Sequence, residues 1–197
     1  VAIAPSYGMY RVAADINDVE MREVLLNPDF SLPVDGLLAA ADSRTKVIWI
    51  CSPNNPTANA FPLADIRRVA DGFGGIVVVD EAYVDYSGKG SMLSMLDECP
   101  NLIVLQTMSK ARGMAALRVG LAFASPEISR LMANVKYPYN VGALTQRTVM
   151  SLLETDISAQ IAETLEQRTL LAEALRGCPC VRRVYPSDAN FLLVEVD

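Results

Sequence analysis

The segment Leu102-Ile-Val-Leu105 is a continuous apolar run. The segment Gln106-Thr-Met-Ser-Lys-Ala-Arg-Gly-Met-Ala-Ala-Leu-Arg118, which contains a lysine, two hydroxyls and two arginines, follows it directly. Three other apolar runs resemble it: Val47-Ile-Trp-Ile-Cys51, Ile76-Val-Val-Val-Asp80 and Val119-Gly-Leu-Ala-Phe-Ala124. Because the apolar residues are continuous rather than alternating, these runs predict strands buried on both faces, as in a parallel sheet covered by helices. A weaker strand is expected within Val19–Leu26.

Helical patterns lie between and after the predicted strands. The segments are Leu63–Gly72, Pro126–Val135, Leu144–Leu153 and Asp156–Arg176. Ser125 suits the N-cap of the second, with Pro126 at its first helical position. Strands that alternate with helices predict the α/β class, here a three-layer sandwich with a mostly parallel sheet covered by helices.

The pattern changes after Gly177, where two strands are expected without a helix between them, in Val181–Val184 and within Pro186–Val196. We therefore expect a large domain over residues 1–155. Residues 156–197 would form a long connecting helix and the first strands of a small α+β domain. Because the chain starts at Val1 without an initiator Met and stops soon after the strand pair, we expect both domains to be incomplete.

The bulk composition narrows the class of protein. A length of 197 residues with 51% apolar residues supports a sizeable core and argues against disorder. The net charge of −6 disfavours nucleic acid or an anionic membrane as the main partner, so local donors must hold any anionic ligand. No apolar run is long enough to span a bilayer, and the N-terminus lacks the features of a signal peptide.

The counts of histidine and cysteine limit the chemistry. The chain has no histidine, which removes every Ser–His or Cys–His nucleophile and leaves lysine, a carboxylate or tyrosine to carry protons. The four cysteines, Cys51, Cys99, Cys178 and Cys180, suit a cytoplasmic protein with reduced thiols. The Cys178-Pro-Cys180 pair is too isolated for a zinc site, and we expect no metal.

Polar residues follow three of the predicted strands, where open α/β sheets bind their ligands. They are Ser52-Pro-Asn-Asn-Pro-Thr57, Asp80-Glu-Ala-Tyr83, and Thr107 with Ser109 and Lys110. An amine beside two hydroxyls, with Arg118 eight residues later, can hold an aldehyde cofactor covalently and grip its phosphate. Each residue also has a simpler interpretation: Asp80 as a turn cap, Tyr7 as a packed loop aromatic, Arg118 in a surface salt bridge and Lys110 as a solvated lysine.

These motifs, in their order, resemble the set found in class I and II aminotransferases of fold type I, which use pyridoxal 5′-phosphate (PLP). The motifs are Ser52–Thr57, Asp80–Tyr83, Ser109-Lys110 and Leu117–Gly120. Pro5-Ser-Tyr-Gly-Met-Tyr10 and Lys136-Tyr-Pro-Tyr-Asn-Val141 resemble one branch, the histidinol-phosphate aminotransferases. The resemblance runs from Pro5 to about Leu193, so residues 1–155 would be the PLP-binding domain.

The resemblance implies a role for each candidate residue. Lys110 would attach the cofactor and move the substrate's proton, and Asp80 would keep the ring nitrogen protonated. Tyr83 and Asn55, the second asparagine of its motif, would donate hydrogen bonds to the ring's phenolate oxygen.

The remaining candidates would hold the ring plane and the phosphate. Tyr7 would lie against the ring face. Thr107, Ser109 and Arg118 would hold the phosphate.

The implied reaction is transamination of histidinol phosphate with 2-oxoglutarate in histidine biosynthesis, by a homodimer with active sites at the subunit interface. Three alternatives stay open: an aromatic aminotransferase, a PLP-dependent decarboxylase of amino-acid phosphates, and a cofactor-domain fragment without turnover. The family also has a glycine-rich start of a helix near the N-terminus and a C-terminal arginine that binds the substrate. Neither feature is found in residues 1–197.

Three residues depart from the family pattern. Ala58 and Ala116 stand where glycine is common, and Gly142 stands where the histidinol-phosphate branch often has asparagine. If residue 58 needs a positive φ angle, alanine would be strained there by about 1 kcal/mol.

Overall fold

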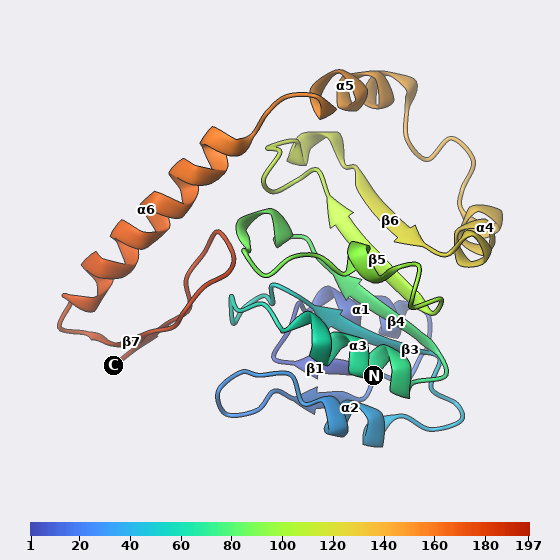
Figure 1. Ribbon diagram of the computed structural model, residues 1–197, viewed down its shortest axis with the longest axis horizontal. Helices are drawn as coiled ribbons and strands as arrows, with labels where there is room; N and C mark the ends of the chain where they lie inside the picture. The colour runs from blue at the N-terminus through green and yellow to red at the C-terminus, as the bar shows by residue number, and fades with distance from the viewer.

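The computed structural model describes all residues from Val1 to Asp197, and its centre is a six-stranded sheet (Figure 1). In spatial order the strands are β2 (Glu23–Leu25), β1 (Ala2–Ala4), β3 (Val47–Cys51), β4 (Ile76–Asp80), β5 (Leu102–Thr107) and β6 (Gly120–Ala124). All neighbouring pairs are parallel except β5 and β6. The predicted α/β class with a mostly parallel sheet is confirmed.

Six α-helices accompany the sheet: α1 (Met9–Ile16), α2 (Val34–Ala40), α3 (Leu63–Gly72), α4 (Pro126–Val135), α5 (Ala143–Leu153) and α6 (Ser158–Arg176). Short 3-10 helices lie at Val84–Tyr86, Met92–Met95 and Ala115–Leu117. The Ser125 hydroxyl accepts a hydrogen bond from the Ile128 amide at 3.4 Å, so the predicted cap of α4 is present. None of the helices has the length and apolar character required to cross a membrane.

Two layers of helices are needed because both faces of the central strands are apolar. Ile48 and Ile50 of β3 join the main core with Ile66 of α3. Trp49, which points to the opposite face of the strand, stacks on Tyr10 of α1 with ring centroids 5.1 Å apart. The sheet is therefore covered on one face by α3 and on the other by α1, which makes a three-layer sandwich.

The prediction of burial on both faces is wrong for β6. Gly120, Leu121 and Ala122 are exposed, although their sequence looks like that of the central strands. The cause is position: β6 is the antiparallel edge strand and pairs only with β5. An apolar run in the sequence cannot indicate how many neighbours the strand will have.

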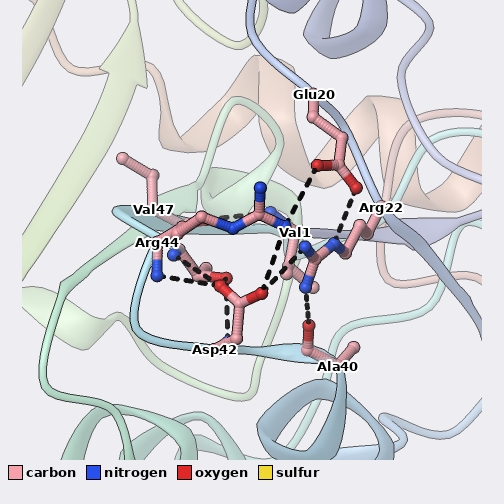
Figure 2. A network of polar contacts seen from close by, with 8 residues as sticks. Val1, Glu20, Arg22, Ala40, Asp42, Arg44 and Val47 are labelled. Carbon is pink, nitrogen blue, oxygen red and sulfur yellow. Dashed lines mark hydrogen bonds and ion pairs between the residues drawn. The ribbon is translucent and has the colours of Figure 1, made fainter.

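A network of ion pairs joins the other end of the sheet to the loop before β3, as Figure 2 shows. Arg22 lies 2.9 Å from carboxylate oxygens of both Glu20 and Asp42, and it donates to the Ala40 carbonyl at 3.1 Å. The hydrogen bond from Arg22 is the main reason that the pKa of Asp42 is lowered to about 2. The network lies on the surface and ties the β2 edge to the end of α2.

The C-terminal residues form a separate layer beside the sheet. Helix α6 leads into an antiparallel pair, β7 (Val181–Val184) and β8 (Val194–Val196), drawn in orange and red in Figure 1. The strand pair after the long helix is confirmed, while the domain division at residues 155 and 156 stays a prediction.

The loop between β7 and β8 is hydrogen-bonded to the turn that follows β3. The Asp188 amide donates to the Ala58 carbonyl at 2.7 Å, and the Asp188 carboxylate accepts from the Ala60 amide at 2.7 Å. Lys89 forms an ion pair with the same carboxylate at 2.9 Å. Asp188 therefore links the C-terminal layer to the sheet through both its backbone and its side chain.

We expect Asp188→Ala to lower the free energy of unfolding by about 1–2 kcal/mol, because it leaves the amide of buried Ala60 without its acceptor. Urea unfolding followed by circular dichroism measures this change. Arg68→Ala is the control: it removes an exposed ion pair with Asp35 and should change stability by less than about 0.5 kcal/mol. Equal losses in the two variants would contradict a specific role for Asp188.

Candidate active site

A cavity of about 520 Å³ opens at the carboxyl ends of β3, β4 and β5. Its wall contains all eight residues that the sequence singled out: Tyr7, Asn55, Asp80, Tyr83, Thr107, Ser109, Lys110 and Arg118. They come from the ends of strands and from the loops that follow them, which the parallel strands bring to one edge of the sheet. The structure thus gathers the whole predicted set in one place.

Two donors hold Asp80 in the wall of this cavity. Its Oδ1 accepts a hydrogen bond from the Ala82 amide at 3.0 Å, and its Oδ2 accepts one from the Tyr10 hydroxyl at 2.8 Å. The first bond is the turn cap that was the simpler interpretation of Asp80. The second was not predicted, and both bonds leave lone pairs on the carboxylate for a ligand.

The two asparagines after β3 have different surroundings. Asn54 is fully buried; its amide nitrogen donates to the Pro5 carbonyl at 3.0 Å and to Thr57 Oγ1 at 2.7 Å, and its oxygen accepts from Ser6 at 2.8 Å. Asn54 therefore fastens the segment that carries Tyr7 to this turn. Asn55 is half-buried and lines the cavity, which leaves its amide available to a ligand.

Lys110 lies over a tyrosine ring rather than beside a carboxylate. Its Nζ is 5.1 Å from the centroid of the Tyr83 ring, and it takes part in none of the ion pairs of the structure. Tyr83 is buried and fixed by an edge contact with Phe191 at 5.1 Å. An amine at a cavity wall without a counter-ion is free to react with an aldehyde.

Two hydroxyls and a guanidinium also line the cavity. Thr107 Oγ1 accepts from the Ser109 amide at 3.1 Å, which folds this short loop back on the end of β5. Arg118 has a left-handed backbone, with φ of 55°, and its Nη1 donates to the Ala115 carbonyl at 2.9 Å. It makes no salt bridge, so four of its five N–H donors stay available.

Two buried acidic groups near Asp80 were missed by the sequence analysis. Glu81 accepts hydrogen bonds from Ser91 at 2.5 Å, the Met92 amide at 2.7 Å and Gln106 at 3.1 Å, and burial raises its pKa. The Cys51 thiol lines the cavity, and burial, with a smaller contribution from the Asp80 charge, raises its pKa to about 12. The sequence alone does not show how deeply the Glu81 and Cys51 side chains are buried.

Ala58 does adopt the positive φ that the glycine pattern implied, at 65°, and it is fully buried. Two interactions offset the strain of about 1 kcal/mol: the Asp188 amide donates to the Ala58 carbonyl, and the Ala58 side chain belongs to the same buried cluster as Tyr83 and Tyr86. This strained turn carries Asn55.

The donor set fits PLP. An unpaired amine, a carboxylate with free lone pairs, and an arginine with free donors beside two hydroxyls face one cavity that is large enough for a phosphorylated ring. Fold and site together define a class of α/β protein whose cavity can hold an aldehyde cofactor through a lysine amine.

The chain belongs to the family of class I and II aminotransferases, whose family model matches residues 1–196. It is 51% identical to histidinol-phosphate aminotransferase of Bacteroides fragilis (strain YCH46) over 198 residues, and 50% identical to the Parabacteroides distasonis enzyme of the same name. All of the chain is covered in both cases, but only 57% of each relative, so the chain spans little more than half of their length.

Two solved histidinol-phosphate aminotransferase structures have the same fold as this chain. Histidinol-phosphate aminotransferase from Clostridium acetobutylicum superposes with a TM-score of 0.90 at 20% identity, covering all of this chain and 61% of that one. The enzyme from Sinorhizobium meliloti, solved in complex with PLP, gives 0.89 at 20% identity and covers 100% and 55%. The donor set of the cavity fits the PLP cofactor of the class I and II aminotransferases, the family to which the chain belongs.

We expect only two of the four thiols to react quickly with Ellman's reagent at pH 8. Cys178 and Cys180 are exposed, whereas Cys51 and Cys99 are buried. With a pKa of about 12, Cys51 is thiolate in only about one molecule in ten thousand at this pH. The double variant Cys178→Ser/Cys180→Ser should show no fast thiol until denaturant is added, and a fast reaction there would contradict the burial of Cys51.

Proposed function

We propose that this chain holds PLP through Lys110 and that the complete protein transfers the amino group of histidinol phosphate to 2-oxoglutarate, a step of histidine biosynthesis. The observation that carries the proposal is the gathering of all eight candidate residues around one cavity, with Lys110 free of any carboxylate. The relatives at 45–51% identity, which bear the name of this enzyme, support the choice of substrate.

Lys110 and the residues around it would carry the proton chemistry. When bound, PLP supplies an electron sink for the bonds at the substrate's α-carbon. The Lys110 amine would attach the cofactor, and it would then take the proton from the substrate's α-carbon and deliver it to the cofactor's C4′ carbon. Asp80 would face the ring nitrogen with its negative charge, and Tyr83 and Asn55 would donate to the phenolate oxygen.

The other candidates would bind and orient. Tyr7, which is 46% exposed at the cavity wall, would lie against the ring face. The Thr107 and Ser109 hydroxyls and the free donors of Arg118 would hold the phosphate. Their role is to fix the reacting atoms in position rather than to react.

We also infer that the complete protein is a cytoplasmic homodimer. Support comes from a group of large apolar side chains that the chain leaves uncovered on α4, α5 and the segment between them: Leu131, Val135, Tyr137, Tyr139, Leu144 and Met150. Tyr137 and Tyr139 are 84% and 97% exposed. Exposed apolar surfaces of this kind mark interaction sites, and the rest of the protein and a second subunit would cover them.

The assignment of Lys110 predicts the outcome of a trapping experiment. Addition of PLP to the chain should give a visible absorption band, and borohydride should convert it to a stable adduct located at Lys110 by mass spectrometry. Lys110→Ala should abolish the adduct, because it removes the amine that forms the bond. Lys46→Ala, at an exposed lysine outside this cavity, should be trapped like the wild type; equal trapping of Lys110→Ala would contradict the assignment.

Turnover by the complete protein distinguishes the substrates. We expect kcat/KM for histidinol phosphate to exceed that for phenylalanine or tyrosine by at least about a hundredfold, because a site that binds a polar group rejects analogues without it. A preference for the aromatic amino acids would make the protein an aromatic aminotransferase. Release of carbon dioxide without amino transfer would make it a decarboxylase.

A further inference from the structure

Tyr10 connects α1 to the residue at the centre of the site. Its hydroxyl donates to Asp80 Oδ2 at 2.8 Å, across 70 positions in the sequence. With the Ala82 amide on Oδ1 at 3.0 Å, the carboxylate is held by one donor on each oxygen, from two different elements. Two donors in different directions fix the plane of the carboxylate, which a single donor would leave free to rotate.

The Tyr10 ring is itself held by two aromatic contacts. It stacks on Trp49 of β3 with centroids 5.1 Å apart and an interplanar angle of 26°. It also forms a T-shaped pair with the Tyr7 ring, with centroids 5.7 Å apart and an interplanar angle of 84°. Tyr10 therefore contacts two of the eight candidate residues, Asp80 and Tyr7, while its own position is set by the sheet.

We propose that Tyr10 is a positioning residue of the cofactor site, which orients Asp80 and holds it as the anion that keeps the cofactor's ring nitrogen protonated. The inference rests on the proposed function, because it assumes that PLP occupies this cavity. A hydroxyl bonds more strongly to a carboxylate than to a neutral carboxyl group. The Tyr10 hydroxyl therefore favours the arrangement in which Asp80 is charged and the ring nitrogen carries the proton.

The charged and titratable groups around Asp80 are consistent with this role. They are Tyr10 from α1, Cys51 from β3, Glu81 next in the chain, and Tyr83, Lys110 and Arg118 around the cavity. Burial, with smaller contributions from Cys51 and Asp80, raises the pKa of Tyr10 far above its ordinary value. Tyr10 thus stays a neutral donor at any physiological pH, and the high pKa of Cys51 keeps a second negative charge away from Asp80.

The test uses PLP labelled with ¹⁵N in the ring, bound to the chain at pH 7, with the ring-nitrogen resonance as the readout. Tyr10→Phe keeps the ring and its stacking on Trp49 and removes only the hydroxyl. We expect the resonance to move towards that of an unprotonated nitrogen, with the ratio of protonated to unprotonated forms falling about tenfold. Asp80→Asn marks the unprotonated limit.

A matched control separates this effect from the general loss of a tyrosine hydroxyl. Tyr185→Phe also removes a hydrogen bond to a carboxylate, that of Glu195 at 3.2 Å, but outside the cavity, and it should leave the resonance unchanged. If Tyr10→Phe does not fold, a fluorinated tyrosine at position 10, a stronger donor of nearly the same shape, must keep the nitrogen protonated. An unprotonated nitrogen in that variant contradicts the inference.

The outcomes distinguish a failure of the role proposed for Tyr10 from a failure of the proposed function. If the wild type is trapped at Lys110 and Tyr10→Phe has the same resonance as the wild type, the role of Tyr10 is overturned while the proposed function stands. If the wild type does not bind PLP at all, both are overturned together.

Discussion

The hydrogen-bond register of three parallel strands is the constraint on which the site depends. Asp80 at the end of β4 pairs with Cys51 of β3 on one side and with Leu105 of β5 on the other. The three strands therefore end at nearly the same level, and the loops that follow them open into one cavity. A shift of one residue in β4 would turn Asp80 to the other face of the sheet. Hydrogen bonds at the strand ends hold this register: the Ser52 amide donates to the Asp80 carbonyl at 2.9 Å, and the Glu81 amide donates to the Leu105 carbonyl at 2.8 Å.

The turn after β3 joins the site to the rest of the chain in two directions. On one side Asn54 holds the backbone of Pro5 and the Ser6 hydroxyl, and so it sets the position of Tyr7. On the other side Ala58 and Ala60 are bonded to Asp188 from the C-terminal layer. The strained backbone of Ala58 is thus fixed from outside the turn, which is the condition under which such strain persists. A movement of the C-terminal layer would reach Asn55 through this turn.

Much of the fold could be predicted because the central strands and longer helices are long and continuous in pattern. The bounds of β3, β4, α3 and α4 agree with the expected segments. Strand β1 was missed because it has only three residues, and α1 was missed because it starts after Gly8 without a side-chain cap and buries no residue fully. The edge position of β6 could not be read from the sequence, since Val119–Ala124 has the composition of a central strand.

The candidate site, like the fold, could be predicted only in part. Residues at strand ends could be predicted, since parallel strands bring their carboxyl ends together. The partner of Asp80 could not, because Tyr10 is 70 residues away and only the packing of α1 on Trp49 brings its hydroxyl to the carboxylate. The burial of Asn54, which separates its role from that of Asn55, is equally a product of tertiary packing.

The residues that line the cavity carry more positive than negative charge, whereas the chain as a whole is negative. This difference explains how an acidic protein can hold a phosphorylated ligand. The net charge is −6, so the overall field repels an anion. Within the cavity, however, Lys110 and Arg118 face a single carboxylate, Asp80. Neither cation is neutralised by an acidic side chain: Lys110 rests on the face of Tyr83, and Arg118 donates to the Ala115 carbonyl. A backbone carbonyl and an aromatic face compensate a positive charge only in part. Both cations therefore keep most of their attraction for an anion, and the positive charge is concentrated where a phosphate and a reactive aldehyde would have to be bound.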